Sequence, residues 1–345
     1  MKFRIIKNYA KTMLFNDKLY CIFRVTHRCN FRCKMCNVWK QKCDELNLEE
    51  IKEVAKILKK SNVSIINLGG GEPLIRKDIV DIVKIFSKDF EVRMQTNGYL
   101  ANEELIKDLV DAGLKNVSIS LDSLDPKKFD DICNSNGAFE KIVYNAELFA
   151  KHLPKRGSML FFNACVSKEN IEELPSLVKF ANEKGYWMGF TPILLSEAED
   201  SNDPYRDFAP EMKLEGDNKT TEVIKELIEM KQEGHMIFNS YDSLVKMDLF
   251  FKEQFDSKWD CDIGKLYFQI LPNGDITPCS EIRAVGNILK EGLDCLKPEL
   301  MDKLKKTCKG CLHPCWYETS QFVHNPKVFI EKGKTILKSY LVKRK

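Results

Sequence analysis

The sequence predicts an α/β fold in which six β–α units follow one another, with a small C-terminal domain made of a β-hairpin and helices. From about residue 20 to residue 195, short β-rich runs alternate with amphipathic helical runs. This is the pattern of a parallel sheet with helices outside it. Unusual polar motifs fall where these strands end. Near the C-terminus, cysteines surround an Asn-Gly turn, the strongest short-range signal for a hairpin.

The elements of the first part can be placed in order. Strands are expected at residues 19–25, 63–69, 91–97, 116–122, 158–166 and 186–194. Helices, with apolar residues at helical spacing, are expected at residues 48–60, 78–86, 102–113, 139–153 and 171–185. Asn47 and Glu50 have the spacing of a capping box for the first helix. Gly113 and Gly185 stand where two helices should end.

Four motifs stand where the first four predicted strands end. They are a cysteine triplet at residues 29–36, GGGEP at 69–73, QTNG at 95–98 and SLDS at 120–123. Because the carboxyl ends of parallel strands meet at one edge of a sheet, ligands of such folds bind there. We therefore expect the four motifs to outline one site.

The chain divides into five expected regions. They are an N-terminal extension (1–19), the α/β core (20–200), an acidic loop with two bridging helices (201–255), a cysteine-rich domain (256–320) and a basic C-terminal helix (321–345). The two bridging helices are expected at 220–234 and 240–255, and the hairpin at 266–279 with its turn at Asn273 and Gly274.

Composition narrows the class of protein. The formal net charge is only +3, from 54 basic and 51 acidic residues, which predicts no nucleic-acid binding. No apolar run approaches the roughly 20 residues that span a bilayer, and the charged N-terminus does not resemble a signal peptide. We expect a cytoplasmic protein. Thirteen cysteines, bunched at gaps of two and three residues in a long chain, favour metal binding over disulfides.

The first cysteine group has the spacing CxxxCxxC at Cys29, Cys33 and Cys36. Three thiolates can hold three corners of a 4Fe–4S cluster and leave the fourth iron open to a small molecule. The alternative is a structural zinc site, which needs four closed ligands. No fourth cysteine accompanies the triplet in the sequence, and His27 lies on the strand side of it.

Taken together, the motifs between residues 18 and 320 resemble those of radical SAM enzymes. The resemblance implies a partial (β/α)6 TIM-like barrel and a site-differentiated 4Fe–4S cluster, held by Cys29, Cys33 and Cys36, that binds S-adenosylmethionine. Met35 takes the place of an aromatic residue that borders the adenine in this family. The implied contacts to S-adenosylmethionine come from Gly70, Gly71 and Glu72 (methionine ammonium), Thr96 and Ser120 (methionine carboxylate or ribose) and Asn163 (ribose).

The chemistry that the resemblance implies is reductive cleavage of S-adenosylmethionine. This releases methionine and a 5′-deoxyadenosyl radical, which abstracts a hydrogen atom from an unactivated carbon, while the barrel orients the substrate. The electron would come from a donor such as flavodoxin or ferredoxin. Each motif also has a simpler interpretation: GGGEP suits any strand-to-helix turn, and Ser120 or Asp122 could cap the following helix.

The second cysteine group resembles the SPASM/twitch extension of radical SAM enzymes, which houses auxiliary 4Fe–4S clusters. Cys261 and Cys279 flank the hairpin, and Cys308, Cys311 and Cys315 follow. The resemblance implies one auxiliary 4Fe–4S cluster held by Cys261, Cys279, Cys308 and Cys311, with Cys315 as an alternative or extra ligand. A zinc ribbon is the rival interpretation. The isolated cysteines are expected to be ordinary thiols: Cys21, Cys43, Cys133, Cys165 and Cys295.

The substrate stays open among a small molecule, a lipid and a peptide. Fewer than 20 residues precede the first strand, which argues mildly against a leader-guided peptide-modifying maturase. Residues 325–345 carry seven basic residues and one acid; they suit a solvated helix docked on the barrel or a helix on a membrane surface. A non-catalytic iron–sulfur or zinc protein, acting as electron carrier or scaffold, is the alternative from another class. Such a carrier has no need for GGGEP, TNG and SLDS.

Overall fold

The structure is a computed structural model. It describes residues 7–8, 11–12, 17–42, 44–193, 210–255, 259, 261–280, 282–307, 311–342 and 344. Cys43, Cys308 and most of the predicted acidic loop lie outside these ranges. The described strands form one sheet in the order β6-β5-β4-β3-β2-β1-β7-β8-β9. The predicted α/β architecture is confirmed, with a sheet that stays open.

The first six strands are parallel to their neighbours, as predicted. They are β1 (Tyr20–Thr26), β2 (Ile65–Gly70), β3 (Glu91–Thr96), β4 (Asn116–Ser120), β5 (Met159–Val166) and β6 (Trp187–Pro192). Their side chains alternate between the two faces of the sheet. One face packs under the helices in the main apolar core, which contains Phe23, Leu68, Met94 and Phe162. The opposite face, which we call the concave face, carries Tyr20 and more polar residues.

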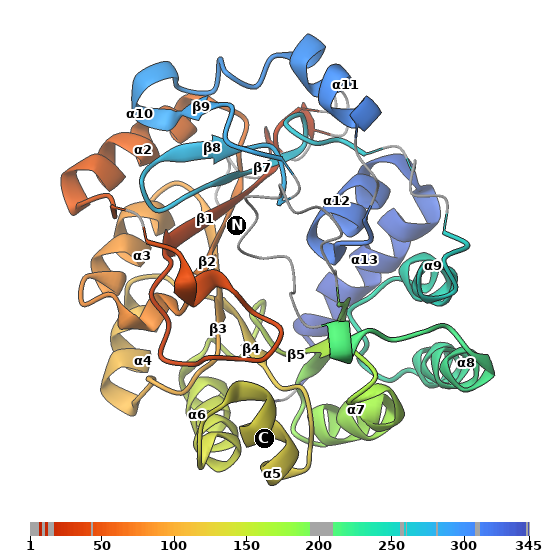
Figure 1. The fold of residues 1–345 in the computed structure, drawn as a ribbon. Coiled ribbons are helices and arrows are strands. Elements are labelled where there is room, and N and C mark those ends of the chain that lie inside the picture. Colours follow the sequence, from red (N-terminus) through yellow and green to blue (C-terminus); the bar gives the residue numbers. More distant parts are fainter. Residues whose placement is uncertain are drawn as a thin grey trace.

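Helices follow one another around the outside of the sheet from α2 to α7, with α8, α9, α12 and α13 lying together beyond β6 (Figure 1). The first group is α2 (Leu48–Lys60), α3 (Ile79–Ser87), α4 (Glu103–Asp111), α5 (Pro126–Cys133), α6 (Ala138–His152) and α7 (Leu174–Glu183). The later helices are α8 (Asn218–Gln232), α9 (Tyr241–Phe251), α10 (Ile288–Glu291), α11 (Pro298–Thr307), α12 (Pro314–His324) and α13 (Pro326–Ser339). None of these described helices is long and apolar enough to cross a membrane.

Local signals account for several helix ends. Asn47 and Glu50 form the predicted capping box of α2. The cap of α5 is Asp125, whose side chain accepts hydrogen bonds from the amides of Lys127 and Lys128. Ser120 and Asp122 are therefore not the caps of that helix.

The C-terminal hairpin continues the main sheet. Strand β7 (Tyr267–Ile270) pairs parallel with β1, while β8 (Asp275–Thr277) and β9 (Gly286–Asn287) are added antiparallel. The hairpin was expected within a separate domain at 256–320, but its backbone hydrogen bonds extend the barrel sheet. The expected boundary at residue 320 also falls inside α12.

Helix α12 connects the two edges of the parallel sheet. Near its start, the Trp316 ring stacks on Tyr267 of β7, with ring centroids 4.6 Å apart. Two residues later, Glu318 accepts hydrogen bonds from the backbone amide and hydroxyl of Ser240, just before α9. The segment leading to Ser240 runs beside β6, where Ile237 bridges Met188. The helix therefore links β7, beside β1, to the segment beside β6.

Candidate functional site

The first cysteine group lies on the loop that follows β1, at the carboxyl edge of the sheet. Cys29, Cys33 and Cys36 are all half-buried. The loop is held from the side by the end of α5: the Arg32 amide donates to the Cys133 carbonyl (3.3 Å) and the Lys34 amide to the Ile132 carbonyl (2.9 Å). The three thiols thus sit on a backbone that a neighbouring helix supports.

Cys133, which the sequence suggested was an ordinary thiol, lies beside this group. A hydrogen bond with Cys133 and burial raise the pKa of the Cys33 thiol well above its usual value. The two residues are a hundred positions apart, and only the packing of α5 against the cysteine loop brings them together. The spacing in the sequence carries no signal of this contact.

The glycines of GGGEP let the end of β2 approach the cysteine loop closely. An added Cβ at Gly70 would lie 2.2 Å from the carbonyl oxygen of Thr26, and one at Gly71 would lie 2.2 Å from that of Arg28. Gly70 also has φ +130°, a backbone angle that residues other than glycine rarely adopt. The backbone amides of Gly71 and Glu72 donate to the Thr26 and Arg28 carbonyls, both at 2.8 Å. The two strand ends form a single, tightly packed edge.

Glu72 is completely buried, and its carboxylate points into the protein. It accepts hydrogen bonds from the Thr96 hydroxyl (2.7 Å), the Asn97 amide (2.7 Å) and the Leu74 amide (2.9 Å). Burial nevertheless raises its pKa to about 7. The carboxylate therefore ties the end of β2 to the end of β3.

Thr96 belongs to the same hydrogen-bond network that joins β2 to β3, and its neighbour Asn97 contacts the cysteine loop. Thr96 is buried; its hydroxyl donates to Glu72 and accepts from the Gly98 amide (2.9 Å). The Asn97 side chain donates to the Asn30 side chain (2.9 Å) and lies 4.0 Å from the sulfur of Cys29. Within the motif TNG, it is Asn97 that contacts the cysteine loop, although the sequence singled out Thr96.

Ser120 and Asn163 are brought together by the strand register. They pair across β4 and β5, so their side chains lie on the same face of the sheet. Ser120 is exposed and Asn163 half-buried, and the Asn163 amide donates to the Thr191 hydroxyl (3.3 Å). Met35 is buried against Ile132, Ile193 and Met212. Ser120 and Asn163 are therefore two predicted contact residues that lie together on the concave face.

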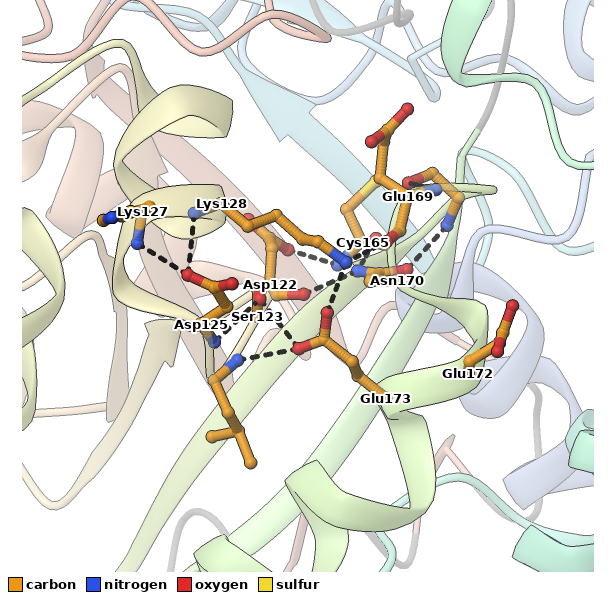
Figure 2. A network of polar contacts seen from close by, with 12 residues as sticks. Asp122, Ser123, Asp125, Lys127, Lys128, Cys165, Glu169, Asn170, Glu172 and Glu173 are labelled. Atoms are coloured by element: carbon orange, nitrogen blue, oxygen red, sulfur yellow. Dashed lines mark hydrogen bonds and ion pairs between the residues drawn. The ribbon is translucent and has the colours of Figure 1, made fainter.

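A polar network holds the ends of β4 and β5 in place (Figure 2). Asp122 accepts a hydrogen bond from the Cys165 amide (2.7 Å), and Asn170 donates to the carbonyls of both residues. Glu173 accepts from the Ser123 hydroxyl (2.7 Å) and pairs with Lys128 (2.7 Å). Burial raises the pKa of Asp122 to about 6. The network joins α5, β5 and the turn just before α7, which fixes the edge on which Ser120 and Asn163 stand.

The second cysteine group surrounds an aromatic cluster on the concave face. Cys279 is buried, and Cys261, Cys311 and Cys315 pack against the same residues. The cluster is built on Tyr20, Tyr267 and Trp316. The Cys261 sulfur lies 2.9 Å from the Tyr267 hydroxyl, and the Tyr20 hydroxyl lies 3.9 Å from the Cys315 sulfur. Four of the five predicted cysteines thus gather around one cluster, while Cys308 lies outside the described residues.

Polar side chains line the concave face near this second group. The Arg24 guanidinium donates to the Gln269 side chain (2.5 Å), which in turn donates to the Ser280 hydroxyl (3.0 Å). Arg24 and Gln269 are both buried. Gln95, at the end of β3, is exposed, and its side chain contacts the Cys315 sulfur. The sequence did not single out Arg24 or Gln269, because a polar residue within a strand carries no signal of which face it occupies.

The residues fit an iron–sulfur cluster with a small ligand at the first site. The donors are soft thiols, which suit iron–sulfur clusters, and the glycine edge beside them has no side chains in the way. Among the residues that the structure describes, no three His, Cys, Asp or Glu side chains converge closely enough to hold a single metal ion.

Comparisons with known proteins agree with this geometry. Residues 23–181 match the family model of the Radical SAM superfamily. A GTP 3′,8-cyclase from Peptoclostridium acidaminophilum is 41% identical over 132 residues, which is 36% of this chain and 40% of that protein. The chain spans about half, or less, of the length of the first curated relatives that it matches.

Two solved structures share the fold at 18% identity. Streptococcus suis SuiB bound to S-adenosylmethionine superposes with a TM-score of 0.64, covering 87% of this chain and 71% of that one. The native anSMEcpe with bound AdoMet and Cp18Cys peptide gives 0.61, covering 92% and 99%. These likenesses concern the fold, and the family match covers the strands that carry the first cysteine group. Residues 23–181, which the Radical SAM superfamily model matches, are therefore similar to a radical SAM domain.

Proposed function

We propose that this chain cleaves S-adenosylmethionine reductively and uses the resulting radical to abstract hydrogen from a small polar substrate. Enzymes of this superfamily use a 4Fe–4S cluster and S-adenosylmethionine. One observation carries the proposal: the cysteine triplet follows β1, the glycine edge ends β2, and Ser120, which ends β4, pairs with Asn163 of β5, all in one run of parallel strands. An electron carrier has no use for a second ligand surface beside its cluster.

In this proposal Cys29, Cys33 and Cys36 hold the cluster. Once bound and reduced, that cluster supplies the electron that breaks the sulfur–carbon bond of S-adenosylmethionine. Gly70 and Gly71 let the end of β2 pack directly against the cysteine loop, and their backbone groups are proposed to contact the methionine part from there. We infer that Glu72 and Thr96 act as positioning residues, since their polar atoms bind each other and the β2–β3 edge.

Ser120 and Asn163 are proposed to hydrogen-bond the ribose or the carboxylate of S-adenosylmethionine. They share a face and a register pair, so one ligand can contact both. Met35, in a buried apolar contact with Ile132, is proposed to border the adenine. Its flexible thioether suits packing against a flat ring.

The second cysteine group is proposed to hold one auxiliary 4Fe–4S cluster that exchanges electrons with the substrate. Cys261, Cys279, Cys311 and Cys315 gather around the Tyr267–Trp316 cluster. Cys308 remains in the predicted ligand set. Cys315 packs against the same aromatic cluster as the other three cysteines. This supports Cys315 as a ligand, whereas the sequence offered it only as an alternative or extra one.

A polar small molecule is the proposed substrate class. The buried Arg24, Gln269 and Ser280 contacts on the concave face would favour polar groups over a lipid chain. The relatives named GTP 3′,8-cyclase also act on a small polar molecule by their names. Flavodoxin or ferredoxin is the proposed electron donor, and the cytoplasm the proposed location.

The test is direct. The protein is purified without oxygen and incubated with S-adenosylmethionine, with and without dithionite. Formation of 5′-deoxyadenosine and methionine that depends on dithionite is expected. If the purified protein holds iron and sulfide and yet forms no 5′-deoxyadenosine, the electron-carrier alternative is favoured instead.

A further inference from the structure

Helix α13 exposes an unusual amount of apolar surface. Among the described residues, eight large hydrophobic side chains are exposed, and six of them lie between residues 329 and 341. These six, which we call the apolar stripe, are Phe329, Ile330, Ile336, Leu337, Tyr340 and Leu341, and they are 44% to 80% exposed. Contiguous exposed apolar patches on soluble proteins usually mark a contact surface.

The stripe occupies one side of the helix. At 3.6 residues per turn, its members fall within an arc of about 140° when the helical spacing is continued through Leu341. Gly333 lies within the same arc, and an added Cβ there would meet nothing within 4 Å. The arc is therefore continuous, and it is open where the glycine stands.

The opposite side of α13 is polar and buried, which inverts the usual arrangement of a surface helix. Lys332, Thr335 and Ser339 are each at most 7% exposed. The Lys332 ammonium lies 3.0 Å from the Glu318 carboxylate of α12 and 4.0 Å from the Phe238 ring centroid. These contacts hold the helix by its polar side. Within the stripe, Phe329 packs on Phe322 and Tyr340 lies beside Gly157, while the exposed fractions show that most of the apolar side is open. Figure 1 shows α12 and α13 next to each other.

The charge beside the stripe is positive. Lys327 and Lys334 are exposed along one border of the arc. Lys338 follows on the same border, but its ammonium donates to the Gly234 carbonyl and lies over the Trp187 ring. The single acid of α13, Glu331, is paired with Lys231 of α8 at 3.0 Å. A groove of about 670 Å³ runs between this border and α8–α9, and these lysines help to line it.

We propose that the apolar stripe is a membrane-docking surface, with α13 lying in the plane of an anionic lipid bilayer. The stripe would enter the boundary between headgroups and acyl chains, and Lys327 and Lys334 would meet the lipid phosphates. Side chains with an apolar stem and a cationic head suit that depth. A second copy of the chain fits less well, because antiparallel pairing of two stripes brings Lys327 and Lys334 of both copies to the same side, and Glu331, the acid of α13, is already paired with Lys231.

Flotation with vesicles tests the proposal on the full, cluster-loaded protein. The probes are vesicles of equal parts phosphatidylglycerol and phosphatidylcholine, and vesicles of phosphatidylcholine alone. We expect binding to the anionic vesicles that weakens with salt. Ile330→Glu together with Leu337→Glu should reduce it by at least about tenfold, and Gly333→Leu should increase it. Tyr144→Glu, an exposed aromatic on α6, is the matched control and should bind like the parent.

Circular dichroism checks that each variant is folded, and sedimentation velocity without vesicles reports self-association. Absence of vesicle binding by the parent protein overturns the proposal. The proposal is also overturned if neither protein binds vesicles and the parent forms dimers that the double Glu variant does not form. Equal binding by the parent and the double variant also overturns it. Formation of 5′-deoxyadenosine is measured in parallel and should be unchanged in all variants, since α13 lies outside the proposed catalytic site.

Discussion

Glu72 is a single buried group that joins two strand ends, and its ionisation should be visible in the stability of the protein. Its pKa of about 7 lies above the ordinary value of 4.5 because the carboxyl is buried. The folded protein therefore holds a proton there that the unfolded chain releases. This contribution to stability is complete below pH 4.5 and is lost as the pH rises through about 7.

Glu72→Gln should remove this pH dependence. The unfolding temperature of the parent should fall relative to that of the variant as the pH rises from 4.5 to 7. The corresponding loss in the free energy of unfolding is roughly 3 kcal/mol. Glu49→Gln, on an exposed side chain of α2, is the control and should follow the parent. A constant difference between parent and Glu72→Gln across this range would show that Glu72 does not titrate there.

Residue types at the strand ends were predictable from the sequence, but their contacts were not. GGGEP, TNG and SLDS stand at the carboxyl edge as expected. Yet the hydrogen bond of Thr96 to Glu72 and the contact of Cys133 with Cys33 were not anticipated. Both contacts depend on how elements far apart in sequence pack, and no local pattern encodes that.

At the scale of elements, the close packing of β1 and β2 makes Gly71 a critical position. An added Cβ there would lie 2.2 Å from the Arg28 carbonyl oxygen and 2.7 Å from that of His27. Both are backbone atoms that cannot swing aside. Gly71→Ala should therefore push the cysteine loop away from β2, at a cost of about 1–3 kcal/mol or more.

The expected result for Gly71→Ala is a lower unfolding temperature together with less bound iron than the parent. Gly333→Ala is the matched control, because its Cβ meets nothing within 4 Å and alanine is favoured over glycine within a helix by about 1 kcal/mol. It should be at least as stable as the parent. If the two variants behave alike, the packing of this edge does not control the cysteine loop.

Periodicity predicted the elements well where each one is long and regular. The six parallel strands agree with their predicted positions. The pairing of β7 with β1 was not predictable, since the Asn-Gly turn specifies a hairpin but not the sheet that it joins. The C-terminal region was expected to form one helix from residue 321, but the structure divides it into α12 and α13. The sequence does carry a local signal for this division, because Asn325 caps α13 and Pro326 begins it.

For the whole molecule, the structure places both cysteine groups around one open sheet. The first stands at the carboxyl edge, and the second packs on the concave face, where Cys315 contacts Gln95 and Tyr20. Helix α12, which carries Cys315 and Trp316, also contacts the segment before α9 through Glu318. A substrate on the concave face would therefore lie between the two groups, and the loss of one should affect turnover differently from the loss of the other.

Cys29→Ala and Cys279→Ala separate the two proposed clusters. The parent should hold about eight irons, and each variant about four. Cys29→Ala should form no 5′-deoxyadenosine, because the open iron site is lost. Cys279→Ala should still form 5′-deoxyadenosine under dithionite but should not convert the substrate.

The measurements are iron and sulfide content, zinc content, and 5′-deoxyadenosine formation. Cys295→Ala, at a buried thiol outside both groups, should match the parent in all of them. A Cys279→Ala protein that keeps the parent's iron, or a parent with zinc in place of half of that iron, would mean that the C-terminal cysteines hold no auxiliary cluster.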